Sequence, residues 1–126
     1  GEPCPENDAQ TVRLIFESLA LRYRQVLGDL DRIAKFPIER LHIIGGGSKN
    51  DLLNQWTANA INRKVVAGPS EGTGIGNVMI QAMAAGVVSS LKEMRSIIHA
   101  SIETKEFTPQ AVEEWEAAYQ RFVTLK

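Results

Sequence analysis

Residues 41–50 read Leu41-His-Ile-Ile-Gly-Gly-Gly-Ser-Lys-Asn50, and this stretch decides the fold. The mostly apolar start predicts a short buried strand, the glycines predict a tight turn, and Ser48 predicts the cap of a following helix. Glycine lets a ligand lie directly against the backbone, and a helix start offers unpaired N–H groups. The stretch therefore predicts a ligand-binding turn. A turn that needs positive φ values and binds nothing is the structural alternative, but three consecutive glycines favour binding.

The segment before the turn predicts one long amphipathic helix. Asn7 or Asp8 can cap its start, because their side-chain oxygens accept from free N–H groups, and Pro37 stops it. Its apolar residues recur at spacings of three and four, which predicts one stripe packed against a core. These residues are Val12, Ile15, Phe16, Leu19, Tyr23, Val26, Leu27, Leu30 and Ile33.

The segment after the turn predicts a second helix and a second strand. Ser48 and Asp51 form a capping-box-like pair, and the helix should begin near Lys49. Its predicted inward residues are Leu52, Leu53, Trp56, Ala60 and Ile61. Residues 64–67 predict the next strand, and strands that alternate with helices predict a parallel βαβ arrangement. Such a sheet leaves its edges open, and the chain lacks an initiator Met, so we expect a piece of a longer protein.

Three further helices are predicted toward the C-terminus. The first lies between Gly72 and Gly86, and its glycines favour close packing on the sheet rather than a dinucleotide site. Ser90 caps the second, which runs to about Ala100. Thr108 and Pro109 begin the third. The predicted inward residues of the first are Ile75, Val78, Met79, Ala82 and Met83, and those of the last are Val112, Trp115, Tyr119 and Phe122.

Composition limits the possible functions. The 126 residues suffice for one domain, and a net charge of −1 argues against a nucleic-acid partner. No apolar stretch approaches the roughly 18 residues of a membrane span. The lone Cys4 fits a cytoplasmic protein. His42 and His99 lack metal-ligand spacing, and no acid–base pair stands out, so we expect neither catalytic residues nor metal ligands in this chain.

Two segments, Gly45–Gln55 and Val65–Asn77, resemble the C-terminal part of the FGGY carbohydrate kinases. Within that family, Ala67-Gly-Pro-Ser-Glu71 and Gly76-Asn77 look most like the rhamnulokinase branch. The resemblance implies an α/β fold: a fragment of the second actin-like (ribonuclease H-like) ATPase domain, helix-rich with short parallel strands. It implies a C-terminal adenosine-binding subdomain over residues 7–126. Residues 1–6 are polar and interrupted by two prolines, which predicts a disordered or irregular N-terminus.

The resemblance also implies a role for the glycine turn. Gly45, Gly46, Gly47 and Asn50 would hold the adenosine of ATP, with Gly46 and Gly47 against it and Asn50 reaching the adenine. The parent would transfer a phosphoryl group from ATP to the 1-hydroxyl of L-rhamnulose. The family's catalytic aspartate, its Mg²⁺ and phosphate loops and its sugar pocket lie upstream of this region, so we expect no activity from this chain alone.

Alternative functions remain open at this point. The parent could be another FGGY sugar kinase, of the xylulokinase, fuculokinase or glycerol kinase type. The chain could instead be a non-catalytic nucleotide-binding module, or a small helical interaction protein with structural glycines. Apolar surface meant for the rest of a parent would favour self-association of the chain.

Overall fold

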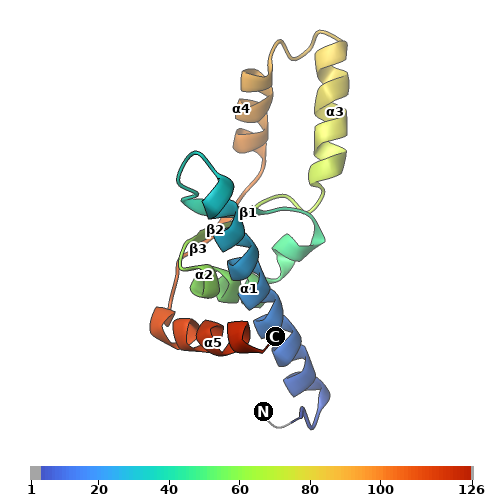
Figure 1. Cartoon of the computed structure of the whole chain (residues 1–126). Helices are drawn as coiled ribbons and strands as arrows, with labels where there is room; N and C mark the ends of the chain where they lie inside the picture. Colours follow the sequence, from blue (N-terminus) through green and yellow to red (C-terminus); the bar gives the residue numbers. More distant parts are fainter. Residues whose placement is uncertain (1–3, 126) are drawn as a thin grey trace.

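The computed structural model describes residues 4–125 (Figure 1). Its helices and strands follow one another along the chain as α1 (Asp8–Ile33), β1 (Arg40–Ile43), a short 3₁₀ helix η1 (Gly46–Lys49), α2 (Asp51–Ile61), β2 (Lys64–Ala67), α3 (Gly72–Ala84), α4 (Leu91–Ser101), β3 (Lys105–Phe107) and α5 (Val112–Thr124). Asn7 caps α1, as predicted, because its side chain accepts a hydrogen bond from the N–H of Gln10. The helix ends before Pro37, also as predicted.

A small mixed sheet lies at the centre of the chain. Its strand order is β1-β2-β3, with β1 and β2 parallel and β2 and β3 antiparallel. The parallel pair confirms the predicted βαβ unit. The third strand was not predicted, because Phe107 is its single apolar residue. Phe107 lies opposite Val65 in the register, and Lys64 forms an ion pair of 2.9 Å with Glu106.

Two hydrophobic clusters meet on α2, which makes that helix the centre of the packing. The first joins α2 to the sheet and to the end of α1, and the second joins α2 to the middle of α1 and to α5. The first cluster is formed by Leu27, Ala58, Ile61, Val65, Ala67 and Phe107. The second is formed by Ala20, Leu21 and Ala60, with Trp56, Trp115, Ala118, Tyr119 and Phe122 packed against it.

The predicted inward face of α2 is wrong in part. Leu52 is 49% exposed, whereas Asn54, Thr57 and Ala58 are fully buried. The cause is the double contact of α2. A helix that packs on a sheet with one side and on two other helices with another side buries more than the narrow stripe expected from a single apolar face.

The predicted inward stripe of α1 is exposed along most of its length. Leu27, one of the predicted residues, packs in the first cluster, and Phe16 is half-buried, but the other predicted residues are exposed. We call the exposed residues the α1 stripe: Val12, Ile15, Leu19, Tyr23, Val26, Leu30 and Ile33, which are 39–76% exposed. Within residues 4–125, the predicted core contact is therefore confirmed for Leu27 and wrong for the seven residues of the α1 stripe.

The helices α3 and α4 project away from the other elements (Figure 1). We call residues 72–101 the arm and the rest of the described chain the body. The prediction of inward residues on α3 is wrong, because none is buried and Val78 is 65% exposed. The predicted close packing of the glycines is wrong for Gly74 and Gly76, where an added Cβ would meet nothing within 4 Å, whereas at Gly72 it would meet the Ile44 side chain at 3.5 Å.

The predicted start of the last helix is wrong by several residues. Residues 108–111 lie outside any helix, and α5 begins at Val112. Two side chains of α2 hold this segment: Gln55 donates to the Thr108 carbonyl at 2.8 Å, and Asn59 accepts from the Gln110 N–H at 2.9 Å. In a helix that started at Pro109, these backbone groups would point in other directions and would not make the two hydrogen bonds. Of the predicted apolar stripe of α5, Trp115, Tyr119 and Phe122 pack against the second cluster, whereas Val112 is not part of it.

Candidate functional site

The glycine turn connects β1 to η1 at the carboxyl end of the parallel strands. Gly45 has φ 84° and ψ −167°, a conformation that is essentially restricted to glycine. Its N–H donates to the Pro69 carbonyl at 2.9 Å, and the Gly68 N–H donates to the Ile43 carbonyl at 2.8 Å. The turn after β1 and the turn after β2 are therefore joined, and Gly45 is needed for the backbone path itself.

Gly46 and Gly47 have a different role from Gly45. Neither has a positive φ, and a Cβ added to either would meet no atom within 4 Å. The fold therefore does not require glycine at these two positions. They stand at the first positions of η1, where a helix supplies no acceptor for the backbone N–H groups. Open space above bare backbone is what close approach of a flat ligand requires.

Asn50, and not Ser48 as predicted, caps the helix that follows the turn. Ser48 is buried inside η1, and its hydroxyl donates to the Gly45 carbonyl at 2.8 Å. Asn50 caps α2, because its Oδ1 accepts from the Leu53 N–H at 3.0 Å. The prediction that Ser48 caps the helix is wrong because the four-residue η1 delays the start of α2 to Asp51.

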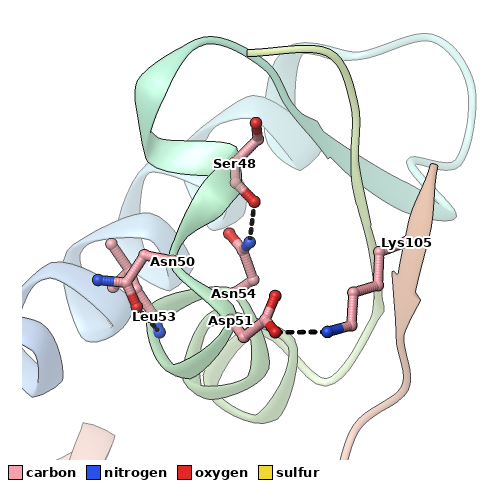
Figure 2. Close-up of polar contacts among 6 residues, drawn as sticks. All are labelled: Ser48, Asn50, Asp51, Leu53, Asn54 and Lys105. Carbon is pink, nitrogen blue, oxygen red and sulfur yellow. Dashed lines mark hydrogen bonds and ion pairs between the residues drawn. The ribbon is translucent and has the colours of Figure 1, made fainter. Parts of the chain in front are cut away.

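Residues of α2 and β3 support the turn from below (Figure 2). The side chain of Asn54, which is fully buried, donates from Nδ2 to the Ser48 carbonyl at 2.8 Å. Asp51 forms an ion pair with Lys105, which ties the first turn of α2 to β3. Nothing in the spacing of the sequence links Lys105 to the glycine turn. Asn54 follows Asn50 by one helical turn, and that spacing is the one signal that could have indicated it.

A hollow of about 510 Å³ lies beside the turn. Ser48 and Lys49 form one wall, residues 67–71 form another, and residues 101–103 with Lys105 close it from the side of β3. Its charged side chains are of both signs, with Glu71 and Glu103 facing the same space as the two lysines. The volume falls in the range of small-molecule sites. Glu71, in the turn after β2, thus lies beside the glycine turn.

The other polar candidates of the sequence do not gather at this site. His42, His99 and Cys4 are exposed in separate parts of the chain. Among residues 4–125, no group of three His, Cys, Asp or Glu side chains is placed to hold a metal ion. Four carboxyl groups elsewhere in the body and arm have lowered pKa values because they accept hydrogen bonds. Arg63 donates to Asp31, Ser89 to Glu93, Lys64 to Glu106 and Arg24 to Glu116. Within the described helices, none has the length and apolar character of a membrane span.

Comparison with known proteins identifies the family of the chain. The family model described as the FGGY family of carbohydrate kinases, C-terminal domain, matches residues 1–85. The chain belongs to this family. The match includes the whole glycine turn and ends at the C-terminus of α3, so α4, β3 and α5 lie beyond it.

Curated FGGY relatives extend the similarity to nearly the whole chain. A rhamnulokinase of Bacteroides thetaiotaomicron is 60% identical over 122 residues, which are 97% of this chain and 25% of that protein. A rhamnulokinase of Pectobacterium atrosepticum is 41% identical over 125 residues, which are 99% of this chain and 25% of that protein. The chain therefore spans about a quarter of the length of these relatives, and its sequence is rhamnulokinase-like.

A solved FGGY structure has the same fold. The crystal structure of xylulose kinase from Rhodospirillum rubrum superposes with a TM-score of 0.76 at 22% identity, over 99% of this chain and 25% of that one. The superposition includes the arm and α5 as well as the body. The predicted fold class, a helix-rich α/β fragment of an actin-like ATPase domain, is confirmed.

Proposed function

We propose that the glycine turn binds the adenosine of ATP in a sugar kinase that contains this chain. The observation that supports it best is the open space above Gly46 and Gly47, two glycines that the fold itself does not require. A purine or ribose can lie there at van der Waals distance from the backbone. Gly45 contributes by shaping the turn.

Asn50 has a narrower role in this proposal than the sequence indicated. Its Oδ1 is used by the Leu53 N–H, so the Nδ2 group is the part that meets the ligand. An amide nitrogen donates, and the matching group on adenine is a ring nitrogen. We therefore assign Asn50 as a hydrogen-bond donor to the adenine ring.

The proposed parent reaction is the transfer of a phosphoryl group from ATP to the 1-hydroxyl of L-rhamnulose in the cytoplasm. The similarity to two rhamnulokinases supports this sugar over those of other FGGY kinases. The groups that bind the sugar, Mg²⁺ and the phosphates belong, in this proposal, to other parts of the kinase. A coupled assay of the purified 126-residue chain with L-rhamnulose and Mg-ATP should show no turnover. Turnover would contradict the assignment of catalysis to those other parts.

Titration of the chain with ATP, followed by ¹⁵N NMR, tests the adenosine site. The largest shifts should fall on residues 45–50, while the amides of α5 stay unchanged. Asn50→Ser keeps a capping oxygen but removes the amide, so the Kd should rise about fivefold without loss of stability. Asn7→Ser makes the same change at the cap of α1 and should leave the Kd unchanged. An absence of shifts at the turn would favour a purely structural role for the glycines.

The α1 stripe supports the proposal that the chain functions inside a larger molecule. Seven exposed apolar side chains along one helix form an unusual surface for a soluble chain. We propose that other parts of the kinase cover the stripe and that the isolated chain self-associates through it. Leu19→Glu should shift the chain toward monomer in sedimentation experiments. Glu17→Gln, on the flank of the same helix, should not.

A further inference from the structure

One buried amide of α2 holds the end of the glycine turn that lies farthest from the sheet. The side chain of Asn54 donates from Nδ2 to the Ser48 carbonyl at 2.8 Å, and its backbone N–H donates to the Asn50 carbonyl at 3.0 Å. Figure 2 shows the amide rising from α2 toward Ser48. Asn54 therefore binds both ends of the Ser48–Asn50 segment.

The same side chain carries an unpartnered acceptor. Its Oδ1 is buried, and no donor within residues 4–125 reaches it. A buried oxygen without a donor destabilises the folded state, whereas leucine, which has a similar shape, would carry no such penalty. The other polar side chains buried on α2 have partners: Thr57 donates to the Leu53 carbonyl at 2.7 Å, and Asn59 accepts from the Gln110 N–H at 2.9 Å. The gain from an amide at position 54 is thus its contact with the turn.

We propose that Asn54 is a positioning residue for the nucleotide, acting through the turn rather than by contact. The turn is held at its start by the bond from Gly45 to Pro69 and at its end by Asn54. Gly46 and Gly47 lie between these two fixed points. A turn that is fixed before the ligand arrives loses less conformational entropy on binding. This inference rests on the proposed adenosine site.

Steady-state kinetics of the full-length kinase that carries this sequence test the inference. Asn54→Leu should raise the KM for ATP about fivefold, and it should change kcat and the KM for the sugar by less than about twofold. The unfolding midpoint should not fall, because the unpartnered oxygen is removed as well. Thr57→Val, one turn along the same helix, is the matched control and should leave the KM for ATP unchanged.

A second variant keeps the test decisive if leucine disturbs folding. Asn54→Asp can donate to the Ser48 carbonyl when its carboxyl group is protonated, and it cannot when ionised. Its KM for ATP, divided by that of the wild type at each pH, should rise as the pH increases. A ratio that stays constant, or a KM for ATP that rises only together with the KM for the sugar, would overturn the inference. Wild-type protein that binds no ATP in calorimetry would instead overturn the proposed function, and the inference with it.

Discussion

The body and the arm are built from similar amphipathic helices, but only the body has a core of its own. In the body, Ala58, Ala60 and Val65 are fully buried between α1, α2 and the sheet. In the arm, α3 buries nothing, and Val88 and Met94 belong to neither hydrophobic cluster. The glycine turn lies on the body, between β1 and α2. The glycine turn is thus held by the best-packed part of the chain, and the arm contributes to the candidate site through Ile75 and Ser101, which line the hollow.

The largest expected effect is the loss of a core side chain in the body. Phe107 is 6% exposed and joins β3 to the first cluster, so Phe107→Ala should lower the free energy of unfolding by about 3–5 kcal/mol. Val87, at the tip of the arm, is 75% exposed, and Val87→Ala should change it by less than about 0.5 kcal/mol. Urea denaturation of both variants measures the contrast. Equal losses in the two would mean that the arm has packing that the structure does not show.

A smaller effect separates the glycines of the turn. Gly45→Ala forces a side chain into a conformation that costs on the order of 1–3 kcal/mol, whereas Gly46→Ala meets open space and should leave stability unchanged. Stability and ATP binding should therefore respond to different glycines. Gly46→Ala should weaken ATP binding in a fully stable protein, because the added methyl group occupies the space of the ligand. A Gly46→Ala variant with unchanged affinity would place the adenosine elsewhere.

Local patterns predicted the elements, and tertiary contacts decided most of what they missed. The strands of residues 41–44 and 64–67 were predicted because a short apolar run between turn residues is a local signal. The strand β3 was missed because only Phe107 is apolar in it, and its pairing with β2 depends on a partner about forty residues away. The start of α5 was wrong for the same reason: Gln55 and Asn59 hold residues 108–110 from a distant helix.

Sequence patterns indicated which residues form the candidate site but not how these residues contact one another. The glycines and Asn50 were identified as a unit because they are adjacent in sequence. The choice of Asn50 rather than Ser48 as the cap of α2 could not be predicted, since either side chain can cap a helix and the choice depends on η1. The exposure of the α1 stripe could not be predicted either. Helical spacing shows which residues share a face, but not whether the partner of that face lies within the chain.

A capping change should affect the arm alone. Ser90 caps α4, with its Oγ accepting from the Glu93 N–H at 3.2 Å, and such a cap is worth about 1 kcal/mol. Ser90→Ala should therefore speed hydrogen exchange of the α4 amides about fivefold, while the amides of α2 exchange at the wild-type rate. Ser96→Ala, within the same helix, is the control and should not speed exchange. Faster exchange in α2 would show that the arm and the body unfold as one unit.

The smallest expected effect distinguishes two carboxyl groups by their response to acid. Hydrogen bonds from Arg63 lower the pKa of Asp31, which joins α1 to the residues after α2, and hydrogen bonds from Ser89 lower the pKa of Glu93 in the arm. A lowered folded-state pKa stabilises the protein above the ordinary value of 3.8 for Asp31, and the contribution disappears as the pH falls through the folded-state pKa. Asp31→Asn should therefore lower the melting temperature slightly at pH 7, and the difference from the wild type should shrink as the pH falls below 3.8. Glu93→Gln should leave the global melting temperature unchanged over the same pH range, because it alters contacts within the arm. A larger loss of melting temperature for Glu93→Gln than for Asp31→Asn would show instead that the arm unfolds together with the body.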